Sequence, residues 1–173
     1  MKKNLLFLNV LLALFVLLLA GNLAFSQSID SSVLNQQVKQ VLLTERFSPL
    51  AKVNDLPEDV RKEFARLGGG SLSMADPGAP YQEGCVVSPP PLPQRRLAFG
   101  GLSPGYCLIQ YERGGKVHYF SLVLFQVKAH VGAKLIWAGS LSDRNLRLSD
   151  VEQLRSAVMS KSVNSYDPSA RLP

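Results

Sequence analysis

The sequence is poor in the residues that most often carry chemistry: it has two cysteines, two histidines and one tryptophan among 173 residues. Charged residues make up only 18% of the chain. No H-E-x-x-H, phosphate-binding loop, calcium-binding loop, S-x-x-K or dinucleotide-binding pattern occurs in it. The two histidines, His118 and His130, lack an acidic cluster nearby, whereas a zinc site normally needs three or four ligands. We therefore expect no cofactor, no metal and no catalytic residues.

The first 26 residues form an apolar leader rather than part of a folded domain. Lys2 and Lys3 precede an apolar run over residues 5–20, and Ala24-Phe25-Ser26 places small residues at a cleavage site. We predict a secretory signal peptide at 1–26, cut before Gln27, in a secreted or periplasmic bacterial protein. The alternative is an uncleaved membrane anchor, because the apolar run over residues 5–20 is at the long end for the hydrophobic region of a signal peptide.

The mature part, residues 27–173, has the size and charge of one small domain. Its 147 residues carry 17 basic and 13 acidic side chains, a net charge of +4. This length fits one compact domain and is too short for two independent enzyme domains. The small charge, together with the export signal, argues against nucleic acid as a partner.

Two helices are predicted in the segment 27–67. Leu34, Val38, Val41 and Leu42 have helical spacing and indicate a helix over 31–43. A second helix is expected from Pro57 to residue 67, because proline suits a first helical turn.

The next segment, 68–94, is rich in proline and glycine and is predicted to be a long irregular loop. Its proline run at 89–93 is typical of a stiff spacer. At the other end of the chain, residues 161–173 show no periodic pattern, and we expect a mobile tail there.

Residues 95–160 are predicted to form an antiparallel meander of about four strands followed by a C-terminal helix packed on the sheet. The strands are expected at 96–99, 107–112, 117–128 and 133–138. A two-residue turn at Gly114-Gly115 would pair Tyr111 with His118 and Cys107 with Leu122. Ser149-x-x-Glu152 indicates a capping box for the last helix. With 27–67 this segment makes one α+β domain.

Cys85 and Cys107 are the only cysteines, and an even count in an exported chain favours a disulfide between them. The bridge would close a loop that contains the proline run. The pair lacks the Cys-x-x-Cys spacing of redox-active sites.

Residues 101–105 match the G-x-S-x-G pattern of serine hydrolases, with Ser103 as the nucleophile. The following residue is Pro104, which has no N–H to donate to an oxyanion. The segment after it is predicted as a strand instead of a helix. A glycine-rich turn is therefore favoured, and a small hydrolase that uses Ser103 with His118 is kept as an alternative.

Four basic residues are expected near one end of the sheet: Arg95, Arg96, Arg113 and Lys116. Such a basic rim would attract an anionic envelope polymer or lipid headgroups. The first hypothesis is therefore an exported, non-enzymatic binding or interaction module of the cell envelope, with an envelope protein or anionic polymer as its partner. A membrane-anchored accessory subunit is the alternative if the leader stays uncut.

Overall fold

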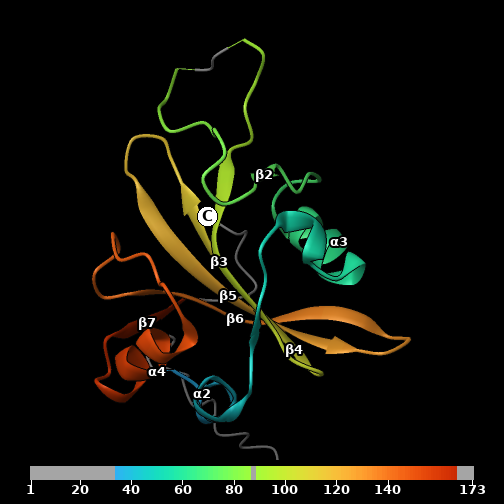
Figure 1. Ribbon diagram of the computed structural model, residues 1–173, viewed down its shortest axis with the longest axis vertical. Coiled ribbons are helices and arrows are strands. Elements are labelled where there is room, and N and C mark those ends of the chain that lie inside the picture. Colours follow the sequence, from blue (N-terminus) through green and yellow to red (C-terminus); the bar gives the residue numbers. More distant parts are fainter. Residues whose placement is uncertain (1–33, 87–88, 167–173) are drawn as a thin grey trace, which may run out of the picture. The chain divides into compact units, whose positions relative to one another are not determined.

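The computed structural model describes residues 34–86 and 89–166 (Figure 1). The predicted leader at 1–26 lies outside these residues. Among the described residues, no helix is long and apolar enough to span a membrane. The fold is mixed α+β, as predicted. Its elements are α2 (Gln36–Thr44), β1 (Ser48–Pro49), the 3-10 helix η1 (Val53–Asp55), α3 (Glu58–Leu67), β2 (Met74–Ala75), β3 (Arg95–Leu102), β4 (Tyr106–Arg113), β5 (Tyr119–Lys128), β6 (Gly132–Leu141), α4 (Val151–Met159) and β7 (Val163–Tyr166).

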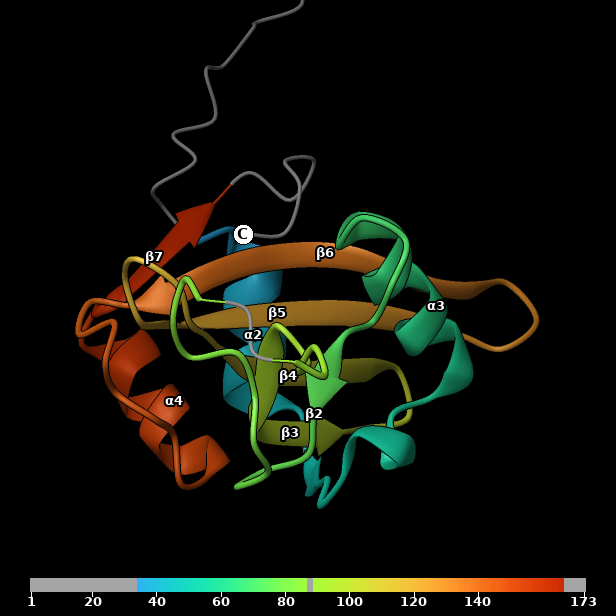
Figure 2. The same ribbon diagram turned by 90° about the horizontal axis from the view of Figure 1, so that it is seen from above.

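The sheet has seven strands, so the predicted meander of about four strands is wrong. The strand order is β1-β3-β4-β5-β6-β7, all antiparallel, and β2 pairs in parallel with β3 (Figure 2). Strands β1 and β2 have two residues each, which is too short to produce an alternating pattern in the sequence. The strand β7 falls in the segment 161–173 that was predicted to be a mobile tail.

The N-terminal helices also differ from the prediction. Helix α2 begins at Gln36, because the side chain of Asn35 accepts a hydrogen bond of 2.8 Å from the Gln37 amide and caps the first turn. The predicted start at residue 31 lies outside the described part of the chain. Between the two helices the structure adds the strand β1 and the helix η1, neither of which was predicted.

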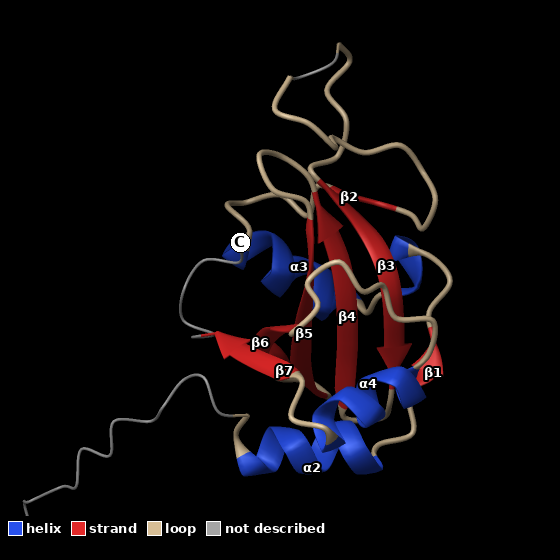
Figure 3. Ribbon diagram, turned by 90° about the vertical axis from the view of Figure 1, so that its left-hand side faces the viewer, coloured by secondary structure: helices blue, strands red, loops and turns tan. Residues whose placement is uncertain are grey.

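The helices cover opposite faces of the sheet, and each face has its own core. Helix α3 packs on one face, and α2 and α4 lie side by side on the other (Figure 3). The α3 core includes Phe64, Leu97, Cys107, Ile109, Tyr111, Val123 and Phe125. The core of α2 and α4 includes Val38, Leu42, Leu108, Leu122, Leu124, Trp137, Leu154, Val158 and Val163. Burial on both faces explains why β4 and β5 are almost continuously apolar.

The predicted pairing of β4 with β5 is wrong by three residues. Cys107 pairs with Phe125, not with Leu122, and Tyr111 pairs with Ser121, not with His118. When the register between two strands shifts by an odd number of residues, each residue is paired with a partner whose side chain lies on the other face of the sheet. Cys107 and Phe125 therefore share the α3 core, while Leu122 belongs to the opposite one.

The reason for this shift lies outside the hairpin. Gly115 has a φ of +123° but donates its amide to the Glu83 carbonyl at 2.9 Å instead of closing a tight turn. A Cβ on Gly114 would lie 2.4 Å from the carbonyl oxygens of Gln82 and Glu83. Both glycines therefore serve a close approach between the hairpin loop and the segment 82–84, and the loop extends over 114–118.

The end of the chain is ordered by α4 and β7. Asp150, not Ser149, is the N-cap of α4 and accepts a hydrogen bond of 3.0 Å from the Gln153 amide. Strand β7 pairs with β6 over Ala138–Leu141, and the Trp137 indole donates a hydrogen bond of 3.0 Å to Ser165 Oγ. These contacts hold residues 163–166 against the sheet.

Candidate functional site

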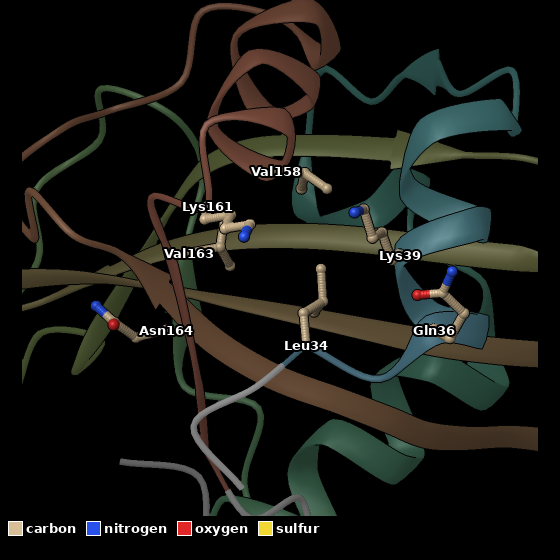
Figure 4. Close-up of a pocket in the computed structure, with 7 residues that line it drawn as sticks. All are labelled: Leu34, Gln36, Lys39, Val158, Lys161, Val163 and Asn164. Atoms are coloured by element: carbon tan, nitrogen blue, oxygen red, sulfur yellow. The ribbon is translucent and has the colours of Figure 1, made fainter. Parts of the chain in front are cut away.

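A groove of about 450 Å³ lies between the start of α2, the end of α4 and β7 (Figure 4). We call it the α2–α4 groove. It has an apolar part, two amides and two lysines. Its lining residues are Leu34, Val158 and Val163, Gln36 and Asn164, and Lys39 and Lys161.

The two lysines come from different elements and face one another. Lys39 extends from α2, and Lys161 follows the end of α4. In Figure 4 their side chains lie on opposite sides of the groove, with Val158 and Leu34 between them and Val163 beneath Lys161. The lining contains no aspartate or glutamate. Among the ion pairs of residues 34–86 and 89–166, none involves either lysine.

Lys161 is held in a backbone conformation that usually belongs to glycine. Its φ is +57°, and it occupies the position just after the C-cap of α4. The amide of Lys161 bonds to the Val158 carbonyl at 3.3 Å, and that of Ser162 bonds to the Ala157 carbonyl at 2.8 Å. These are the two bonds of a Schellman motif, in which glycine is preferred at this position. A lysine here has a conformational cost that glycine would avoid.

The structure separates the two residues of the alternative hydrolase reading, Ser103 and His118. Ser103 lies in the turn between β3 and β4, where its amide bonds to the Tyr106 carbonyl at 2.8 Å. His118 lies beyond the other end of β4, next to the start of β5. The eight residues of β4 span roughly 25 Å at about 3.3 Å per residue, so these side chains do not form a dyad.

A buried polar cluster, which sequence reasoning missed, surrounds Glu112 at that far end of β4. Arg96 Nε donates a hydrogen bond of 2.8 Å to Glu112 Oε2, and His118 Nε2 contacts Oε1. The Arg96 guanidinium stacks over the Tyr81 ring at 4.4 Å. Burial acts to raise the pKa of Glu112, but hydrogen bonds from His118 and Arg96 and the positive charge of Arg96 outweigh it and hold that pKa below its ordinary value.

The cluster ties loops to the sheet. Tyr81 is almost fully buried. Its burial, and to a smaller extent the nearby Glu112 carboxylate, raises the pKa of its hydroxyl. His118 belongs to the hairpin loop, and Tyr81 belongs to the irregular segment after β2. His130 lies apart from the cluster, exposed in the turn between β5 and β6 with a φ of +61°. Within the described ranges, no group of three or more potential metal ligands gathers.

The predicted basic rim is not assembled. Arg95 is buried, with its guanidinium 5.7 Å from the Phe64 ring and 5.8 Å from the Tyr111 ring, and burial lowers its pKa. Arg96 is neutralised by Glu112. The sequence pattern places Arg95 and Arg96 at the start of a strand, but it does not show that Arg95 points into the α3 core.

The predicted disulfide between Cys85 and Cys107 is not formed, and both thiols are free. Cys107 is fully buried near the Ser103 end of β4. The segment that leads to Cys85 is fixed at the opposite end, where Glu83 bonds to Gly115. A disulfide needs Cα atoms closer than about 7 Å, and an even cysteine count carries no information on that distance.

Comparison with protein-family models, with curated proteins and with solved structures finds no match for this chain. Its function is therefore inferred from the geometry of its own residues.

Proposed function

We propose that the protein is an exported, non-enzymatic binding module of the bacterial cell envelope, which holds an anionic ligand in the α2–α4 groove. Export rests on the leader pattern at 1–26, and the mature chain is proposed to begin at Gln27 and to act in the periplasm or outside the cell. An intact mass that retains residues 1–26, in protein recovered only with detergent, would support the anchored alternative.

The observation that carries the binding proposal is the facing pair of Lys39 and Lys161 in a groove without acidic residues. Like charges that converge repel one another, and an anion between them removes the repulsion. Helix dipoles do not add to this preference, because the positive N-terminus of α2 and the negative C-terminus of α4 both lie at the groove.

The absence of catalysis is proposed from the separation of Ser103 and His118. A nucleophilic serine needs a base within hydrogen-bond reach and a prepared oxyanion site. Ser103 is buried in a tight turn beside Pro104, which donates no N–H. A fluorophosphonate probe should therefore leave Ser103 unlabelled.

The binding proposal is tested with inorganic polyphosphate, an anionic polymer without an apolar part. Protein purified after expression of the full sequence should bind it weakly, with affinity that falls as salt rises. The double variant Lys39→Gln with Lys161→Gln should lose most of this binding. The matched control is Lys128→Gln with Lys134→Gln, which removes the same charge from exposed positions on β5 and β6 and should bind normally. An equal loss of polyphosphate binding in both double variants would show that only the net charge matters and would refute the α2–α4 groove as the binding site.

A further inference from the structure

Resting on the proposed function, we infer that Arg155 is a positioning residue of the α2–α4 groove, which ties α4 to the end of α2 and thereby sets the separation of Lys39 and Lys161. Arg155 is not one of the residues that line the groove. It acts through the two helices from which the lysines extend.

The first argument is the contact that Arg155 makes with α2. Its Nη2 donates a hydrogen bond of 2.7 Å to the carbonyl of Glu45, the residue that follows the last turn of α2 as its C-cap. A positive charge is favoured at this end of a helix, where carbonyl groups lack partners within the helix. Among the hydrogen bonds of residues 34–86 and 89–166, no other joins α2 or its caps to α4. The remaining contacts between the two helices are apolar and carry little directional information.

The second argument is the fixed orientation of the Arg155 side chain. Glu152, which lies one turn earlier on α4, contacts Nη1, and the arginine side chain is only 24% exposed. A guanidinium is a planar fork that holds two acceptors in a fixed geometry, which a lysine cannot do. Arg155 Nε is buried without a hydrogen-bond partner in the described part of the chain, and this offsets part of the stability gained. The side chain therefore fixes geometry at a limited net gain in stability.

The third argument is where this contact lies relative to the groove. Lys39 lies six residues before Glu45, and Lys161 lies six residues after Arg155. At about 1.5 Å per residue, each lysine is roughly 9 Å along the helix direction from the contact. The start of α2 meets the end of α4 at the groove, so the two helices run antiparallel and both lysines stand at the same end of the pair.

The fourth argument is the charge at that end. The ammonium groups of Lys39 and Lys161 repel one another, and no acidic side chain lines the groove to offset the repulsion. This force favours separation of the two helices at the groove. The contact between Arg155 and the Glu45 carbonyl opposes the separation, so both lysines stay within reach of one small anion.

The first experiment measures the separation of the lysines without any ligand. Protein purified after expression of the full sequence is treated with two amine-reactive cross-linkers that differ only in spacer length. Peptide mapping then quantifies the bridge between Lys39 and Lys161. We expect Arg155→Gln to lower the yield of the short bridge severalfold relative to the long one. The control for stability is Val60→Ala, which destabilises the core under α3 on the opposite face of the sheet and should leave this ratio unchanged.

The second experiment compares a short anion with a long one. Pyrophosphate must contact both lysines at once, whereas long-chain polyphosphate can contact each lysine through a different phosphate. Arg155→Gln should weaken pyrophosphate binding about three- to tenfold, because the lysines are no longer preorganised. It should lower the affinity for polyphosphate no more than Lys128→Gln does, which removes the same charge from an exposed position on β5. Arg155→Lys keeps the charge but loses the planar fork, so the ratio of the two affinities should change in the same direction by a smaller factor.

The outcomes distinguish this inference from the function on which it rests. An unchanged cross-link ratio in Arg155→Gln, with lysine-dependent binding of anions intact, would overturn the inference and leave the anion-binding module in place. Equal weakening of pyrophosphate and polyphosphate binding would show that Arg155 acts only through stability or net charge, and would also overturn it. If the wild type binds neither anion in a lysine-dependent way, the proposed function is refuted and the inference falls with it.

Discussion

Arg96 and Glu112 lie directly opposite one another on β3 and β4, and the guanidinium contacts Glu112 Oε2 through Nε at 2.8 Å and Nη2 at 2.7 Å. Glu112 is almost fully buried, and its second carboxylate oxygen, Oε1, is contacted by His118 Nε2. This cross-strand pair therefore connects the edge of the sheet, the hairpin loop and the segment around Tyr81.

The first prediction is that Glu112→Gln destabilises the protein by about 2 to 3 kcal/mol, because it leaves the Arg96 guanidinium with only the exposed carboxylate of Glu83, 3.9 Å away. Arg96 is about one-fifth exposed, which limits the loss. Urea unfolding measures it. The matched control is Glu58→Gln, which breaks the solvent-exposed pair with Lys62 and should destabilise the protein far less. Equal losses in the two variants would show that burial of the Glu112 pair is unimportant.

The second prediction concerns acid. The pKa of Glu112 is held below its ordinary value in the folded state, so the unfolded state binds more protons as pH falls. The stability that this group contributes is present above about pH 4.5 and is lost as pH falls through the lower, folded pKa. The stability difference between wild type and Glu112→Gln should therefore shrink between about pH 5 and pH 3. A difference that stays constant over this window would contradict the shift.

The third prediction concerns the thiols. Burial raises the pKa of Cys107 to about 12, whereas Cys85 is exposed. In the folded protein a thiol reagent at pH 8 should modify Cys85 alone. Cys107 should react only after unfolding, because its raised pKa keeps it protonated and its burial keeps the reagent out. Peptide mapping after labelling identifies the modified residue. Protection of both thiols until a reductant is added would indicate a disulfide.

The fourth prediction tests the contact that sets the hairpin. Gly114→Ala places a methyl group against the Gln82 and Glu83 carbonyls and should destabilise the protein by about 1 to 3 kcal/mol. It should also speed hydrogen exchange at the Gly115 amide, which bonds to Glu83. Gly105→Ala is the control, because its new methyl group would meet nothing within 4 Å. Unchanged stability and exchange in Gly114→Ala would show that the loop does not depend on this contact.

Local patterns predicted the class of the fold but not its pairing. The apolar residues Val38, Val41 and Leu42 form the buried stripe of α2, as their spacing indicated. The shift by three residues between β4 and β5 could not be read from the hairpin, because both strands are apolar on both faces and alternation then gives no preference for one register. The segment 82–84, far away in the sequence, decides the loop instead.

The sequence by itself determined the mixed α+β class and the burial of both faces of the long strands, because these depend on side chains close together in the chain. Only the tertiary structure decided that Arg95 is buried, that Cys85 and Cys107 stay apart and that Lys39 faces Lys161. The two lysines are separated by more than a hundred residues, and nothing in their local sequence distinguishes them from solvated surface lysines. Their meeting depends on how α2 and α4 pack on one face of the sheet, which is set by long-range burial of apolar surface.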